Sequence, residues 1–250
     1  MTTSTELLPG TYLSHLRSDA ARMSDVAVRD IDAAVPTCPG WTVREAIVHT
    51  GEVYSHKVAC MRVGQRPDDD DYLHEPGDAE DPVAWFRDRL DELVGELQQR
   101  GPDAPSYTWF EPRQTVGFWY RRMAQETAVH RVDVESAFDG VTPVDDDLAV
   151  DGIDEVLDWF LAYQAEDVGP DGPGRGTVAV RTGDHIWRVA LTADDVELSR
   201  EPGPADAVAS GEPSELLLWL WGRRPDSAVT TEGDAELLGA LRERLRVVTQ

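Results

Sequence analysis

Four long segments in the first 140 residues carry apolar side chains at every third or fourth position. They span about residues 5–28, 42–63, 82–100 and 115–138. This spacing places the apolar side chains on one face of an α-helix, and four such helices joined by short loops favour a helical bundle. We therefore expect an N-terminal four-helix bundle that occupies residues 1–143.

Local signals mark where these helices begin and end. Thr42 is followed three residues later by Glu45, a capping box that opens the second helix. Trp41, just before this box, is expected to pack back on the first turn of the helix as a hydrophobic staple. Gly140 stands where a C-terminal glycine cap of the fourth helix is expected.

The pattern changes after Pro143. Short runs of β-forming residues follow a predicted helix at 148–166, and the first two flank a Gly-Asp turn. The expected strands are 177–181, 186–191, 196–200, 206–210 and an edge strand at 228–232, and the expected helices are 214–221 and 235–248. The sequence therefore predicts an α+β fold overall, with a small C-terminal α+β domain at 144–250.

Charge excludes two classes of partner. Asp and Glu number 48 against 23 Lys and Arg, which gives a formal net charge of −25. Binding to nucleic acid requires a basic surface, and anionic membranes repel so acidic a protein. The longest apolar run, residues 216–221, is too short to span a bilayer.

The N-terminal segment, the number of cysteines and the distribution of apolar residues indicate the compartment and the oligomeric state. Residues 1–23 do not have the pattern of a signal peptide, and the two cysteines, Cys38 and Cys60, are too few for a disulfide framework. The chain shows no heptad repeat and no long exposed apolar stripe. We therefore expect a cytoplasmic protein that is a monomer.

The chemistry is expected to centre on the fourth predicted helix. Glu126 and His130 are four residues apart, so both side chains project from one face. A carboxylate and an imidazole in this arrangement suit zinc or a neighbouring first-row metal. His49, in the middle of the second helix, is the best candidate for a third ligand, and His56 is a weaker one. The alternative is an ion pair with a buried, hydrogen-bonded histidine.

Several other residues are expected to have supporting or structural roles. Asp133, close to His130 on the helix, either orients that ligand or is a surface carboxylate. Arg121 and Arg122 are expected at the surface or in ion pairs, and Cys38 is expected to be a buried structural thiol. Most of the tryptophans are expected in the core, with Trp119 a candidate for the lining of a pocket.

Three segments resemble one known family. They are residues 35–51 (VPTCPGWTVREAIVHTG), residues 121–135 (RRMAQETAVHRVDVE) and the stretch from DAVASG at 206–211 to LLLWLWGR at 216–223. In this order they resemble the mycothiol-dependent maleylpyruvate isomerase family of actinobacteria, part of the DinB-like superfamily. The resemblance covers nearly the whole chain.

The resemblance implies a DinB-like four-helix bundle that holds a divalent metal, usually zinc, on His49, Glu126 and His130. Many members of the superfamily have His at the position of Glu126, and a carboxylate there agrees with the isomerase branch. The C-terminal domain resembles the sterol-carrier-like domain of the family. Arg223 is similar in position to a carboxylate-binding arginine; the alternative is a cation favoured by the end of the preceding helix.

The chemistry expected of such a site is thiol-dependent. Three protein ligands leave a position open, and a thiol that enters it, mycothiol in this family, loses its proton. The thiolate then attacks an electrophilic small molecule such as maleylpyruvate. Isomerisation and S-transfer to a xenobiotic or biosynthetic electrophile differ only in the steps after this attack. A non-catalytic small-molecule-binding protein is the third possibility.

Overall fold

The structure, a computed structural model, describes residues 5–72, 75–77, 80–168, 174–193 and 195–249. The chain divides into two compact units. One comprises Leu7–Thr142, and the other runs from Pro143 to the C-terminus and includes Thr5 and Glu6. The first is helical and the second contains a five-stranded sheet with helices, so the predicted α+β class is confirmed. Within the described ranges, no helix has the length and apolar character needed to cross a membrane.

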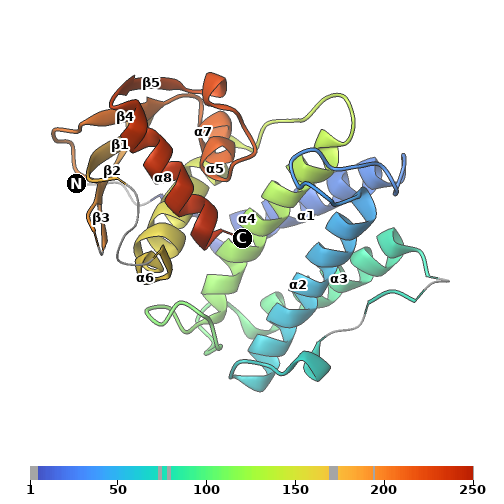
Figure 1. The fold of residues 1–250 in the computed structure, drawn as a ribbon. Coiled ribbons are helices and arrows are strands. Elements are labelled where there is room, and N and C mark those ends of the chain that lie inside the picture. The colour runs from blue at the N-terminus through green and yellow to red at the C-terminus, as the bar shows by residue number, and fades with distance from the viewer. Residues whose placement is uncertain (1–4, 73–74, 78–79, 169–173, 194, 250) are drawn as a thin grey trace. The chain divides into compact units, whose positions relative to one another are not determined.

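The N-terminal unit is the predicted four-helix bundle (Figure 1). Its helices are α1 (Pro9–Ala27), α2 (Val43–Val63), α3 (Pro82–Arg100) and α4 (Val116–Ser136), with a short 3₁₀ turn, η1 (Asp69–Asp71), between α2 and α3. Helix α1 packs on α4, α2 packs on α3, and α2 also contacts α4. The contact between α2 and α4 is the one that builds the candidate site.

The helix starts follow the predicted signals. The backbone N–H of Thr42 donates to the Glu45 carboxylate at 2.5 Å, so the capping box is confirmed. The carboxylate of Asp81 accepts from the N–H of Val83 at 2.9 Å. These acceptors satisfy N–H groups that have no partner within the helix.

The end of α4 differs from the prediction. The helix stops at Ser136 rather than 138, and its C-cap is Ala137, not Gly140. The N–H groups of Ala137 and Phe138 donate to the carbonyls three residues back, which tightens the last turn and closes the helix early. Gly140, with φ of 100°, instead allows a turn in the loop after the helix.

Close packing of α2 on α3 depends on a glycine. A Cβ atom built on Gly51 would lie 2.1 Å from the Trp85 ring, so only glycine lets this indole approach the α2 backbone. Trp85 is buried at this contact. The pair therefore fixes the separation of the two helices.

Helix α4 is buried along almost its whole length. Arg121 and Arg122 are 2% and 4% exposed, so the expectation of a surface position is wrong for both. Arg122 does form an ion pair, with Glu126 at 2.5 Å. Contacts of α4 with α1, α2 and α3 explain the burial. Charged groups inside such a helix are stable only when they have partners.

The C-terminal unit begins with α5 (Asp146–Glu155), which continues as a π-helical stretch, η2 (Val156–Ala162), and α6 (Ala165–Val168). The single regular helix predicted at 148–166 is thus interrupted, and nothing in its residue types marks the wider turns. The other helical elements are α7 (Pro213–Leu220), the 3₁₀ turn η3 (Asp226–Ala228) and α8 (Ala235–Val248).

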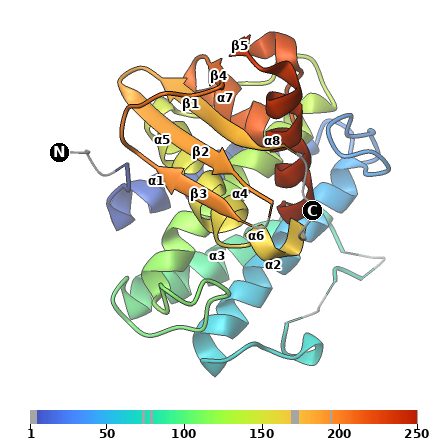
Figure 2. The ribbon, with the colours of Figure 1, turned by 60° about the vertical axis from the view of Figure 1, so that its left-hand side comes forward.

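The sheet has the strand order β3-β2-β1-β4-β5 (Figure 2). Its strands are β1 (Gly176–Thr182), β2 (His185–Leu191), β3 (Val196–Ser199), β4 (Ala207–Ser210) and β5 (Thr230–Gly233). Only β1 and β4 pair in parallel; the other neighbours are antiparallel. The predicted edge strand begins two residues late, because η3 occupies 226–228.

Alternate residues of β2 are buried, including Trp187 and Val189, so one face of the sheet is covered. The Trp187 indole N–H donates to Asp154 of α5 at 2.9 Å. Helix α8 contacts β1 and β4. The core of this unit therefore lies between the sheet and its helices.

Candidate metal centre

Three of the predicted site residues come together in the N-terminal unit. His49 lies in the middle of α2, and Glu126 and His130 lie one turn apart on α4. Each offers one ligand atom, and these atoms all lie within 4.8 Å of one another. Within the described ranges, no other set of three His, Cys, Asp or Glu side chains meets this criterion.

Glu126 stands between the two imidazoles. Its Oε1 lies 3.2 Å from Nε2 of His130 and 3.7 Å from Nε2 of His49. Its other oxygen, Oε2, accepts from Nη2 of Arg122 at 2.5 Å. One carboxylate oxygen is therefore held by the arginine, while the other faces the two histidines.

Asp133 lies on the opposite side of His130. Its Oδ2 is 3.0 Å from Nδ1 of His130, and its Oδ1 accepts from the Thr37 hydroxyl at 2.7 Å. Asp133 is completely buried. A buried carboxylate beside Nδ1 stabilises the tautomer with its proton there, which leaves the Nε2 lone pair free for a metal.

Charges in this group shift its proton equilibria. Burial would raise the pKa of Glu126, but His130, His49 and Arg122 outweigh it and hold that pKa well below the usual range. Burial would lower the pKa of His130, yet Glu126 and Asp133 raise it to about 9. Without a metal, a proton on His130 therefore neutralises part of the negative charge.

Trp41 flanks the site, a position that the sequence pattern does not predict. Its ring centroid is 5.0 Å from that of His49, and it stacks on His130 at 6.1 Å. The residue lies just before the Thr42 capping box, so the start of α2 carries it to this position. The position of Trp41 directly before the capping box is the sequence signal for this contact, but the pattern by itself predicts only a hydrophobic staple.

The remaining candidates lie elsewhere. His56 is not part of the three-residue group: it contacts Lys57, Cys60 and Tyr72. Burial raises the pKa of Cys60 to about 11, so its sulfur is a thiol at neutral pH. Cys38, expected to be buried, is only partly so.

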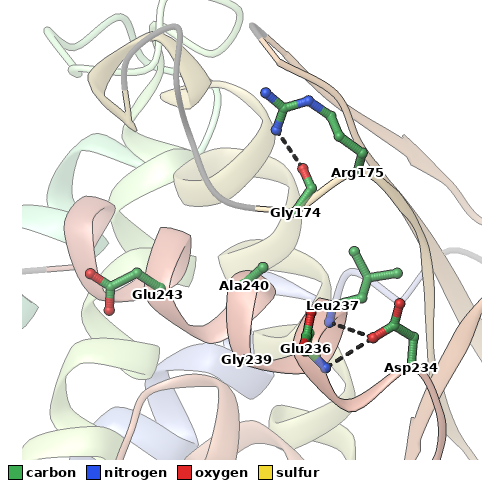
Figure 3. Close-up of a pocket in the computed structure, with 8 residues that line it drawn as sticks. All are labelled: Gly174, Arg175, Asp234, Glu236, Leu237, Gly239, Ala240 and Glu243. Atoms are coloured by element: carbon green, nitrogen blue, oxygen red, sulfur yellow. Dashed lines mark hydrogen bonds between the residues drawn. The ribbon is translucent and has the colours of Figure 1, made fainter.

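Arg223 belongs to the C-terminal unit, three residues after α7 ends, and its Nη1 donates to the carbonyl of Trp221 at 2.8 Å. The same unit contains a hollow lined by Gly174, Arg175 and residues at and near the start of α8 (Figure 3). Its polar groups serve local structure. Asp234 accepts from the N–H groups of Glu236 and Leu237, and Arg175 donates to the carbonyl of Gly174. The hollow therefore offers no chemistry comparable to that of the three-residue group.

Two nitrogen donors and one carboxylate oxygen fit a divalent first-row metal such as zinc. The fit has a second basis in the structure. The far side of each α4 ligand is already occupied, by Asp133 for His130 and by Arg122 for Glu126. The atoms that remain available for a metal, Nε2 of His130 and Oε1 of Glu126, face one another at 3.2 Å.

Comparison with known proteins identifies the family of this chain. The family model described as the mycothiol maleylpyruvate isomerase N-terminal domain matches residues 15–135, and the model of the corresponding C-terminal domain matches residues 147–240. The chain therefore belongs to the mycothiol maleylpyruvate isomerase family, which is a family of enzymes. No curated protein matches the sequence.

Solved structures show the same fold. One is a mycothiol-dependent maleylpyruvate isomerase in which a histidine is replaced by alanine; it superposes with a TM-score of 0.60 at 14% identity. A second structure of a mycothiol-dependent maleylpyruvate isomerase gives 0.57 at 15% identity. Each match covers 95% of this chain and 98% of the other.

Proposed function

We propose that this protein is a divalent-metal-dependent enzyme that uses mycothiol to isomerise an electrophilic small molecule of the maleylpyruvate type. The observation that carries the proposal is the convergence of His49, Glu126 and His130 in a member of this family. The metal is proposed to be zinc, held by Nε2 of the two histidines and Oε1 of Glu126. When bound, it would lower the pKa of a thiol so that the thiolate forms near neutral pH.

The chain's own residues would prepare the site for this chemistry. The side chain of His49 is 39% exposed, so the group is open to ligands from that side. Asp133 would hold the proton on Nδ1 of His130, and Arg122 would fix the Glu126 carboxylate. Preorganised ligands of this kind need no rearrangement when the thiol arrives.

The proposed reaction needs no oxidant or reductant. The thiolate sulfur forms a bond to one carbon of the activated cis double bond, and the electron pair of that bond moves towards the conjugated carbonyl. The remaining single bond rotates. The C–S bond then breaks, the double bond re-forms as trans, and the thiol is released unchanged. Arg223 is proposed to bind a substrate carboxylate through both oxygens.

The proposal also includes a cytoplasmic, monomeric protein. Low-molecular-weight thiols are kept reduced in that compartment, and Cys38 and Cys60 form no disulfide in the part of the chain that the structure describes. Size-exclusion chromatography with light scattering would test the monomer.

The test of function is an assay of zinc-loaded protein with mycothiol and maleylpyruvate, with products separated by liquid chromatography. The trans isomer with full recovery of thiol is the expected result. Accumulation of a stable thiol conjugate would instead identify an S-transferase. If the zinc-loaded protein binds the electrophile but gives neither product, the protein is a non-catalytic binding protein.

A further inference from the structure

Lys57 has an unusual environment for a cation in this protein. It is the only lysine among 23 Lys and Arg, in a chain of net charge −25. Its ammonium contacts Nδ1 of His56 at 2.8 Å and lies 5.2 Å from the centre of the Trp119 ring. Among the described residues, no carboxylate lies within ion-pair distance of it.

Neither partner neutralises this charge. Burial lowers the pKa of His56 to about 4, with Lys57 and Arg66 acting in the same direction against Asp69, so the ring is neutral at pH 7. The Trp119 ring attracts a cation through its π-system only. A partly buried ammonium with no anion at ion-pair distance is energetically costly, because desolvation is only weakly offset by a more distant counter-charge.

Lys57 adjoins the face of α4 that carries the proposed ligands. Trp119, Arg122, Glu126 and His130 follow one another at intervals of three or four residues, so they share that face. The Trp119 ring is held in place, because its indole N–H donates to the Ser106 hydroxyl at 3.0 Å. Burial lowers the pKa of Lys57, Glu126 acts to raise it and Arg122 to lower it, so the ammonium lies close enough to interact with both side chains.

Arg122 does not make Lys57 redundant. Its guanidinium is committed to Oε2 of Glu126. The ammonium of Lys57 has three donors, of which His56 accepts only one. Lys57 therefore retains hydrogen-bonding capacity beside the site.

We propose that Lys57 binds a carboxylate group of the electrophilic substrate, next to the His49–Glu126–His130 group. This inference rests on the proposed function and adds a residue that determines specificity for anionic electrophiles. A substrate carboxylate would supply a counter-charge at ion-pair distance, which none of the described protein residues does. In a protein this acidic, a local cation is also needed to overcome repulsion of an anionic substrate.

The test compares Lys57→Gln and Lys57→Arg with wild type, all zinc-loaded and matched for metal content. Arg44→Gln is the charge control, because it removes one positive charge from an exposed position of the same helix. Maleate, a cis-enedioate, is the anionic probe, and its dissociation constant is measured by calorimetry. Dimethyl maleate, its neutral ester, is the control electrophile in a mycothiol-dependent conversion assay.

We expect Lys57→Gln to weaken maleate binding roughly 10-fold to 100-fold, the range for a charged hydrogen bond. Lys57→Arg and Arg44→Gln should stay within about threefold of wild type on the same scale. Conversion of dimethyl maleate by Lys57→Gln should fall by a much smaller factor than the affinity for maleate. Unaltered maleate binding in Lys57→Gln, an absence of maleate binding by wild type, or an equal loss of dimethyl maleate conversion would each overturn the proposal.

If the proposed enzymatic function is wrong but the role of Lys57 is right, the same experiments would give a different pattern. Wild type would then convert neither electrophile, while maleate binding and its dependence on Lys57 would persist. Unfolding curves of the variants show whether the substitution has merely destabilised the fold, and Lys57→Arg provides a charged replacement if Lys57→Gln does not fold.

Discussion

Nδ1 of His130 lies 3.0 Å from a carboxylate oxygen of Asp133, one turn further along α4. The pair turns Nε2 of the same imidazole towards Glu126, at 3.2 Å. The buried carboxylate of Asp133 thus orients His130, which lies next to the second proposed ligand on α4, Glu126. Loss of the Asp133 carboxylate should therefore weaken metal binding, although Asp133 is not itself one of the proposed metal ligands.

Asp133→Asn should weaken zinc binding by about 10-fold to 100-fold, the usual effect of losing such a partner. The amide can present its NH₂ to Nδ1, which favours the tautomer with the proton on Nε2 and removes the metal donor. Thr37→Val is the matched control, since it deletes a hydrogen bond to Asp133 but keeps the carboxylate. Competition with a chromophoric chelator measures the affinity. Equal affinity in wild type and Asp133→Asn would contradict the positioning role.

The metal-free protein should lose stability as pH rises through about 9. Glu126 and Asp133 raise the pKa of His130 to about 9 against the opposing effect of burial. Its usual value is about 6.5. Since the folded-state pKa is the higher one, the stabilisation is complete below about pH 6.5 and disappears as His130 deprotonates. Urea unfolding of wild type and His130→Asn across this range tests it. A stability difference that does not shrink between these pH values would be inconsistent with the prediction.

A buried ion-pair network joins α1 to α4. Arg131, 2% exposed, contacts Asp19 at 3.1 Å and Glu135 at 2.9 Å, and Arg22 also pairs with Glu135. Arg131→Ala removes one ion pair from each of Asp19 and Glu135, so we expect a loss of about 3–5 kcal/mol of unfolding free energy. Arg17→Ala, at an exposed position of α1, should cost less than about 0.5 kcal/mol. Equal losses in the two variants would rule out a structural role for the network.

The contact of Gly51 with Trp85 gives a prediction about packing. Gly51→Ala should destabilise the bundle by about 1–3 kcal/mol, because the new methyl group overlaps the indole. Gly95→Ala is the matched control on α3, where no atom lies within 4 Å of the added Cβ. Alanine there should stabilise the helix by about 0.5–1 kcal/mol. Thermal unfolding measures both, and a stabilised Gly51→Ala would show that the helices can move apart freely.

Much of the bundle could be predicted because its signals are local. The capping box at Thr42 and the proline starts at Pro9 and Pro82 act within one turn of a helix. The end of α4 could not be predicted in this way. It depends on turn bonds and on the carboxylate of Glu135, which accepts from the N–H of Thr142 beyond the loop.

The residues of the candidate site also fall into those that local sequence patterns predict and those that depend on packing between segments. Helical spacing places Glu126 beside His130, and the position of His49 in the middle of the predicted second helix makes it the best candidate for a third ligand. The contributions of Trp41, Thr37 and Lys57 depend on how separate segments meet. Their side chains reach α4 from the loop before α2 or from α2 itself, and sequence spacing does not specify that packing.

Metal content tests the central claim most directly. Elemental mass spectrometry would be applied to untagged wild type and to Glu126→Ala after incubation with zinc and removal of the excess. The account predicts one zinc ion per chain in wild type and a loss of that ion in Glu126→Ala. If wild type held no metal after incubation with zinc, nickel or manganese, His49, Glu126 and His130 would be a polar cluster of the fold and the proposed chemistry would be wrong.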